Sequence, residues 1–205
     1  FIYNTGERVL GTTTPVYTLL MAAWSLVTGS QAFPLFALIT NALADTLNTY
    51  LVYHLGRRLS HRPLVGWAAA SLWAISSPSV TFAIGGMETS VFILLMLGAF
   101  TAHIEQRLRA SAVLAALALL TRPDAALIAV LIAGQLALEN FKFQLSNFKA
   151  RPFHLRFEIW LLTFVAVAAP WFIFATLYFG NPLPQSVFAK SLAYRLPPEA
   201  GLITL

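Results

Sequence analysis

The sequence contains no cysteine, and only 10% of its 205 residues are charged. Without cysteine, the chain has no disulfide framework, no thiolate nucleophile and no cysteine-ligated metal site. A typical soluble domain has about 25% charged residues, so 13 basic and eight acidic side chains are too few to cover a soluble globule of this length. The scarcity of charge excludes a soluble enzyme, a nucleic-acid-binding domain and a disordered linker.

The beginning of the chain also lacks the usual features of a natural start. Phe1 stands in place of an initiator methionine, and neither a basic segment nor the apolar core of a signal peptide follows it. We therefore expect the chain to be an internal fragment of a longer protein.

Apolar residues, in contrast, are abundant: 58% of the chain is hydrophobic, and its mean hydropathy is +0.72. A transmembrane helix needs about 20 mainly apolar residues. Three segments meet this requirement plainly, and they are residues 33–55, 63–84 and 158–179. Residues 89–103 are adequate with their flanks, whereas the run 15–28, with Tyr17 and Trp24, is typical of a short helix in the membrane interface.

These segments predict an all-α fold, a polytopic transmembrane helix bundle with short broken helices and one juxtamembrane helix. We expect a single partial membrane domain over residues 1–205. Within it, residues 1–32 form an outer loop and the juxtamembrane helix, residues 33–179 form the bundle, and residues 180–205 form a further outer loop.

Two apolar runs, 111–121 and 123–138, are each too short to cross a bilayer, and Arg122-Pro123-Asp124 separates them. One continuous helix would place an arginine and an aspartate near the bilayer centre, at about 2.5–3.5 kcal/mol each. Proline costs about 3 kcal/mol inside a helix but is favourable at the start of a new one. We therefore predict a hairpin of two half-length helices, with Arg-Pro-Asp at a recessed tip beside a polar cavity.

The basic residues predict how the bundle lies in the membrane. With the hairpin in place, three connections on one face carry nine of the 13 cations, namely Arg57, Arg58, Arg62, Arg107, Arg109, Lys142, Lys149, Arg151 and Arg156. The positive-inside rule makes this face cytoplasmic. The net charge of +5 thus reflects membrane topology, and we expect membrane lipid rather than nucleic acid as a partner.

The opposite, outward face collects four polar clusters rich in glycine and proline, at residues 4–15, 85–89, 121–124 and 178–190. Structural explanations compete with functional ones at each cluster. Glu88 could simply begin a helix, Arg122 could pair locally with Asp124, and Lys190 could be an interfacial anchor. Glu7 and Arg8 could likewise be a solvated surface pair.

Two further groups of polar residues have mainly structural explanations. Asn41, Asp45 and Asn48 share one helix face, which favours hydrogen bonds between helices of the bundle. The four histidines have no metal-ligand spacing and lie at predicted cytoplasmic ends; they are His54, His61, His103 and His154.

The outward clusters resemble the GT-C class of membrane glycosyltransferases, and most of all its arabinofuranosyltransferase-like branch. The similar segments are residues 1–17, Gly-Met-Glu-Thr at 86–89, Arg-Pro-Asp at 122–124, and the run from Tyr178 to Lys190. The resemblance implies inverting transfer of a sugar from a polyprenyl-phosphate donor to an acceptor hydroxyl of a glycan, lipid or protein. It also implies that the catalytic base lies upstream of Phe1, in a bacterial inner or plasma membrane protein whose active site faces outward.

Within that framework, physical chemistry suggests roles for the residues present. Arg122 and Lys190 would bind the leaving phosphate and stabilise its developing charge. The remaining candidates would bind sugar or acceptor hydroxyls or an ion, and they are Glu88, Asp124, Glu7, Arg8, Thr12, Thr13, Asn181 and Ser186. The sequence permits a divalent cation at this site but does not require one.

Two other functions compete with sugar transfer. A transporter or lipid flippase would also use broken helices and buried ionisable residues, although no inverted repeat is evident and the polar clusters gather at one face. A non-catalytic membrane scaffold would not need a recessed Arg-Pro-Asp hairpin.

Overall fold

The computed structural model describes residues 10–146, 155–182 and 184, and every regular element among them is helical. The chain divides into two units, which are considered separately. The main unit is Thr14–Ala168, and the second unit comprises Phe1–Thr13 with Ala169–Leu205.

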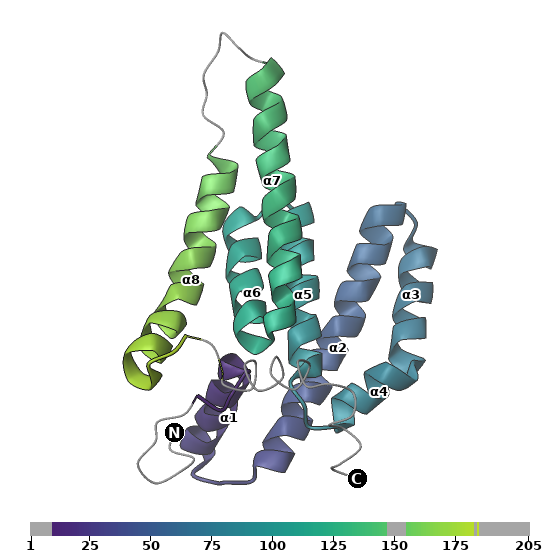
Figure 1. Cartoon of the computed structure of the whole chain (residues 1–205). Helices are drawn as coiled ribbons and strands as arrows, with labels where there is room; N and C mark the ends of the chain where they lie inside the picture. The colour runs from purple at the N-terminus through teal and green to yellow at the C-terminus, as the bar shows by residue number, and fades with distance from the viewer. Residues whose placement is uncertain (1–9, 147–154, 183, 185–205) are drawn as a thin grey trace, which may run out of the picture. The chain divides into compact units, whose positions relative to one another are not determined.

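Seven α-helices and the first part of an eighth make up the main unit (Figure 1). In chain order they are α1 (Pro15–Thr28), α2 (Phe33–Ser60), α3 (Pro63–Ile75), α4 (Ser77–Ile84), α5 (Thr89–Ile104), α6 (Leu108–Thr121), the short 3₁₀ helix η1 (Pro123–Ala125), α7 (Ala126–Ser146) and α8 (Arg156–Phe179).

Proline sets where many of these helices begin. It occupies the first or second position of α1, α2, α3, α4 and η1, where its missing N–H is not needed and its fixed φ suits the helix. Glycine ends α1, because Gly29 adopts a left-handed φ of 64° and donates its N–H to the Ser25 carbonyl.

Among the described residues, three helices are long and apolar enough to cross a membrane: Phe33–Ser60, Pro123–Phe141 and Arg156–Phe179. The pair α4 and α5 passes the same test together but is bent by 118°. The juxtamembrane helix predicted at residues 15–28 has the same limits as α1. The all-helical fold is therefore confirmed for the described residues, and it has three to four candidate membrane spans.

The prediction of one span over residues 63–84 is wrong, because the structure has two helices there. Ser76 has extended backbone, and its Oγ accepts a hydrogen bond from the Ser79 N–H at the start of α4. Pro78 explains the break, since its ring would clash with the carbonyl four residues earlier in a continuous helix. Figure 1 shows α4 turned away from the axis of α3.

The hairpin predicted around Arg122 is confirmed in one respect and wrong in another. Arg122 has extended backbone, and α6 and α7 lie side by side with η1 at their joint (Figure 1). However, α7 has 21 residues, so only α6, with 14, is short. Glu139 and Asn140 mark the end of the apolar run, but they do not end the helix because such residues tolerate helical backbone.

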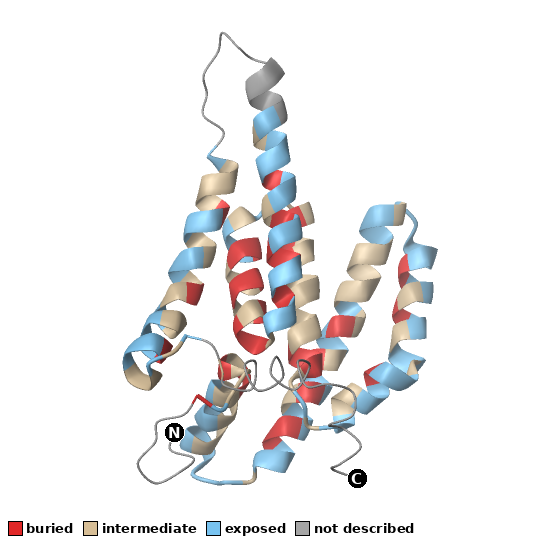
Figure 2. Cartoon of the chain, in the orientation of Figure 1, coloured by how far each residue is buried: buried red, intermediate tan, exposed pale blue. Residues whose placement is uncertain are grey.

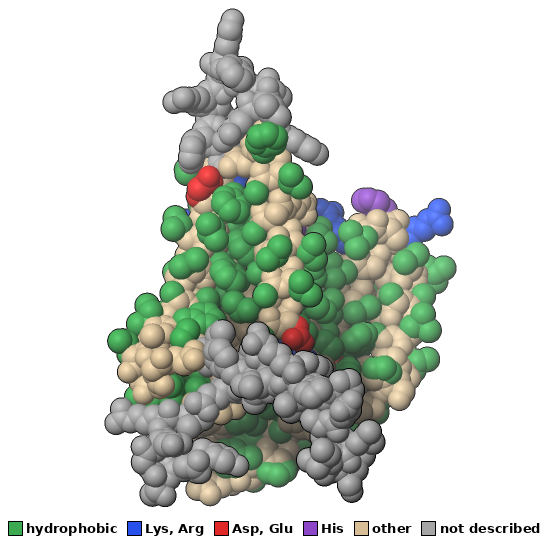
Figure 3. All heavy atoms as spheres, in the orientation of Figure 1, with side chains coloured by type: hydrophobic (Ala, Val, Ile, Leu, Met, Phe, Trp, Pro, Cys, Tyr) green, Lys and Arg blue, Asp and Glu red, His purple; other side chains and the backbone are tan. Residues whose placement is uncertain are grey.

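The core of the main unit lies between α5, α6, α7 and the start of α8 (Figure 2), and it is rich in alanine. Small side chains allow these helices to approach closely. Trp160 on α8 fills the remaining space; it is 1% exposed and donates from Nε1 to the Ser111 Oγ at 3.2 Å. Large apolar side chains face outward instead (Figure 3), as expected for a surface that contacts lipid.

Six of the nine cations predicted to share one face lie at one end of the main unit, whereas the side chains of Lys142, Lys149 and Arg151 lie outside the described residues. His54, near the end of α2, contacts Glu105 at the end of α5. Arg156, at the start of α8, pairs with Glu139 and donates to the side chain of Gln106. The connections α1–α2, α4–α5 and α6–α7 lie at the other end (Figure 1).

In the second unit, α8 ends at Phe179, and the next residue, Gly180, has a left-handed φ of 75°. Aromatic rings cover the last turns of this helix, where Phe174 stacks on Tyr178 with centroids 5.4 Å apart.

Candidate functional site

Arg122 is the centre of a polar cluster at the end of the main unit opposite to the basic connections. Its backbone leaves α6 in extended form (φ −148°, ψ 133°), while its N–H still bonds to the Ala118 carbonyl. Pro123 follows and starts η1. This break turns the Arg122 side chain out of the helix while its backbone stays anchored.

Two carboxylates hold the guanidinium. Asp124 Oδ2 accepts from Nη2 at 2.8 Å and from Nε at 3.3 Å. Glu88 Oε1 lies 3.6 Å from Nη1. The Asp124 side chain is 63% exposed, whereas those of Glu88 and Arg122 are 18% and 31% exposed. The cluster therefore joins the α4–α5 connection to the α6–α7 tip.

Glu88 stands at the N-cap of α5, as the structural explanation of this residue requires. Its side chain, however, makes no capping hydrogen bond, and its carboxylate is paired with Arg122 instead. The local pair between Arg122 and Asp124 is also present. Both structural explanations thus hold in part, and neither accounts for the contact between Glu88 and Arg122.

The ring of Phe92 packs against the guanidinium of Arg122. Phe92 follows Glu88 by one turn of α5, and its ring centroid lies 5.5 Å from the Cζ of Arg122. A cation over an aromatic ring at this distance is stabilised by about 0.5–2 kcal/mol.

Residues 86 and 87, which lead into Glu88, are held by side chains from α1 and α2. The Tyr17 hydroxyl donates to the Gly86 carbonyl at 3.1 Å. Asn41 donates from Nδ2 to the Met87 carbonyl at 2.7 Å and to the Tyr17 hydroxyl at 3.3 Å. Gly86 has a φ of 70°, which a side chain would strain. This network fixes the position of Glu88.

The pKa of the Tyr17 phenol is raised above its ordinary value. Burial is the largest cause of the rise, the hydrogen bond from Asn41 opposes it, and the nearby Glu88 charge adds to it. The phenol is therefore neutral at physiological pH and keeps its proton for the Gly86 carbonyl.

The hydrogen bonds between helices predicted for the α2 face are confirmed. Besides Asn41, Asn48 donates to the Ser90 carbonyl at 3.0 Å. Asp45 is half-buried and paired, since it accepts from Trp73 Nε1 at 3.1 Å and from Ser79 Oγ at 2.7 Å.

Of the predicted site residues, the structure brings together Arg122, Glu88 and Asp124. Thr12, Thr13 and Asn181 are half-buried residues of the second unit. Four others lie outside the described residues: Glu7, Arg8, Ser186 and Lys190.

Sequence reasoning missed the parts that Tyr17 and Phe92 play in the cluster. Phe92 carried a signal, because a residue four positions after Glu88 shares its helix face. The contact of Tyr17 with Gly86 joins residues 69 positions apart, and no sequence spacing indicates it.

Chemically, the cluster offers two acceptor carboxylates and one donor guanidinium, which suits a ligand with both hydroxyl and anionic groups. The described part of the chain has no group of three or more His, Asp or Glu residues that could hold a metal ion. Comparisons with protein-family models, with curated proteins and with solved structures found no match to this chain.

Proposed function

We propose that the chain belongs to a membrane glycosyltransferase of GT-C type. It would transfer a sugar from a polyprenyl-phosphate donor to an acceptor hydroxyl, with inversion, on the outer side of a bacterial plasma membrane. The observation that carries this proposal is the cluster of Arg122 with Glu88 and Asp124. It unites the Gly-Met-Glu-Thr and Arg-Pro-Asp segments, on which the resemblance rests, at the end opposite to the basic connections.

Arg122 would bind the donor phosphate. A guanidinium presents two parallel N–H groups that match phosphate oxygens, and its charge stabilises the negative charge that develops on the leaving group. Its strongest present partner is Asp124, which is largely exposed. An exposed ion pair contributes only about 0–1 kcal/mol, so a phosphate can replace this carboxylate at small cost.

Glu88 would keep the guanidinium in place during that exchange. It is less exposed than Asp124, and Asn41 and Tyr17 hold the residues before it. The displaced Asp124 carboxylate would then accept hydrogen bonds from sugar hydroxyls. Lys190 would supply a second cation, because its ammonium group is a compact point charge.

A transporter or lipid flippase is the competing function, and one observation favours it. The pair α4 and α5 is bent by 118°, and broken helices surround the midplane sites of many transporters. The Arg122 cluster lies at the very break between these helices, so both functions would use the same residues, and only chemistry separates them.

The test is release of polyprenyl phosphate from a sugar-loaded donor by the full-length protein in membranes. We expect Arg122→Ala to lower the rate at least about 100-fold, the usual effect of removing one group that stabilises transition-state charge. Arg109→Ala is the matched control, because Arg109 is an exposed arginine at the opposite end of the main unit.

Near-normal release by Arg122→Ala would overturn the phosphate role of this residue. Movement of the intact lipid-linked sugar across the membrane, without any release of polyprenyl phosphate, would instead establish the transporter.

A further inference from the structure

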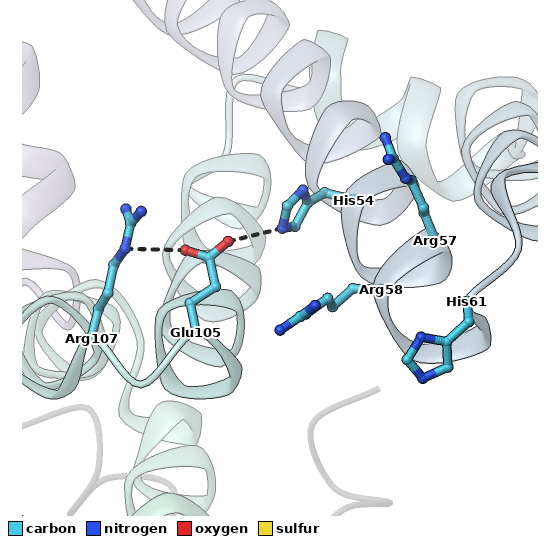
Figure 4. A pocket seen from close by; sticks show the side chains of 6 residues that line it. All are labelled: His54, Arg57, Arg58, His61, Glu105 and Arg107. Carbon is cyan, nitrogen blue, oxygen red and sulfur yellow. Dashed lines mark hydrogen bonds and ion pairs between the residues drawn. The ribbon is translucent and has the colours of Figure 1, made fainter.

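A polar cleft of about 640 Å³ lies at the basic end of the main unit (Figure 4). The last two turns of α2 form one wall, and the connection between α5 and α6 forms the other. All the residues that line it have ionisable side chains, and they are His54, Arg57, Arg58, His61, Glu105 and Arg107.

The residues that α2 contributes to the cleft follow a regular spacing in the sequence. His54, Arg57 and Arg58 occur at positions i, i+3 and i+4, so they share one face of the helix, and His61 follows as the C-cap residue of α2. This face is turned toward the end of α5, because His54 Nε2 lies 3.0 Å from Glu105 Oε1.

Positive charge exceeds negative charge in the cleft. Glu105 is the one acidic residue among the described residues that line it, and its carboxylate is already paired with His54 and with Arg107 Nε at 3.2 Å. Arg57 and Arg58 are exposed and form no ion pair with any residue that the structure describes. Figure 4 shows Arg58 extending across the cleft toward the α5 side. Two guanidinium groups are thus available to an anion.

Two helix ends shape the cleft. Apart from glycines, His61 and Gln106 are the described residues with left-handed backbone, at φ 57° and 62°. His61 is the C-cap of α2, and Gln106 directly follows the C-cap of α5. Left-handed backbone at these positions ends both helices and so leads the chain away from each wall of the cleft.

The length of α2 puts this cleft at the level of lipid headgroups. Its 28 residues extend about 42 Å at 1.5 Å per residue, whereas the hydrocarbon core is about 30 Å thick. The apolar run of α2 ends at Leu55, which leaves Arg57, Arg58 and the end of the helix for the polar region of the membrane. Arg57 and Arg58 of the cleft would then lie at the depth of lipid phosphates.

We propose that this cleft binds the phosphate of an anionic phospholipid. Arg57 and Arg58 donate charge-assisted hydrogen bonds to the phosphate oxygens, while Glu105 joins the two walls through His54 and pairs with Arg107 on its own wall. Basic pockets between transmembrane helices are suited to such headgroups. The site is separate from the Arg122 cluster and does not depend on the function proposed for that cluster.

The test uses fluorescent phosphatidylglycerol titrated into the full-length protein in neutral detergent. We expect saturable binding that neither phosphatidylcholine nor millimolar inorganic phosphate displaces. The double variant Arg57→Gln/Arg58→Gln should weaken binding at least about tenfold more than Arg62→Gln/Arg109→Gln. The control pair removes the same charge from exposed arginines outside the cleft at the same end.

Three results would overturn the proposal. Equal weakening by the two double variants would mean that binding is diffuse electrostatic attraction. Displacement by inorganic phosphate would make a soluble anion the ligand, and displacement by phosphatidylcholine would show that the anionic headgroup is not recognised.

A measurement on the unaltered protein keeps the proposal testable if a variant does not fold. Phosphatidylglycerol should slow hydrogen exchange at residues 54–61 and 105–107 relative to phosphatidylcholine. Equal exchange in the two lipids would overturn the site.

Discussion

Replacing Asn41 with leucine should uncouple the Arg122 cluster from the rest of the bundle. Asn41 is fully buried, and its Nδ2 donates to the Met87 carbonyl at 2.7 Å and to the Tyr17 hydroxyl at 3.3 Å. Leucine has a similar volume, so Asn41→Leu opens little cavity. The substitution removes the amide that donates to the Met87 carbonyl, and Met87 directly precedes Glu88.

The expected cost in stability follows from these contacts. An unsatisfied buried acceptor costs about 1–3 kcal/mol, and hydrogen bonds between membrane helices average about 0.6 kcal/mol. The Asn41 Oδ1 is buried without a hydrogen-bond partner among the described residues, so its removal offsets part of the loss. We expect a net cost of about 1–2 kcal/mol, which corresponds to a melting temperature lower by roughly 2–8 °C.

Asn48→Leu is the matched control. Asn48 is equally buried on the same helix and donates to the Ser90 carbonyl at 3.0 Å, and its Oδ1 also lacks a partner among the described residues. Both variants should lose similar stability, but only Asn41→Leu releases the segment before Glu88. A displacement of about 1 Å at a reacting group can cost about 100-fold in rate.

The assay is release of polyprenyl phosphate at saturating donor, beside thermal unfolding in the same detergent. Asn41→Leu should be at least about tenfold slower than Asn48→Leu at equal folded protein. Equal rates in the two variants would refute the argument that Asn41 positions Glu88.

Two further predictions concern packing. Gly66→Ala would place a Cβ 2.7 Å from the Tyr53 carbonyl oxygen, and this overlap should cost about 1–3 kcal/mol of stability. The control is Gly134→Ala, whose Cβ meets no atom within 4 Å. This control should leave the melting temperature unchanged or raise it. A Gly66→Ala protein as stable as Gly134→Ala would contradict the close contact of α2 with α3. Trp160→Phe removes a buried indole and its hydrogen bond and should cost about 1–3 kcal/mol of stability. Trp67→Phe, at an exposed position, should cost about 0.5 kcal/mol or less. Comparable melting temperatures of these two variants would argue against packing of α8 on α6.

The parts of the fold that follow local rules could be predicted from the sequence. The limits of α1 follow from Pro15 at its start and Gly29 at its end, and the break at Arg122 follows from Pro123 and the cost of burying charge. The break at Ser76 obeys the same proline rule through Pro78. It was missed because hydropathy over residues 63–84 continues across it.

Contacts between distant segments required the structure. The sequence placed Glu88 and Arg122 on one face, but their contact depends on how α5 packs against α6. For the basic cleft, in contrast, the sequence does carry a signal. The spacing of His54, Arg57 and Arg58 indicates one helix face, and His61 follows at the end of the same helix. The histidines were considered only as metal ligands, for which their spacing is unsuitable.

The central claim is that the Arg122 cluster and the basic cleft lie on opposite sides of the membrane. Because the chain has no cysteine, Asp124→Cys and Arg58→Cys can each be labelled singly with a membrane-impermeant maleimide. Both positions are exposed. We expect Asp124→Cys to react in intact cells and Arg58→Cys to react only after permeabilisation. Labelling of both positions from the same side, or the reverse order, would contradict the account.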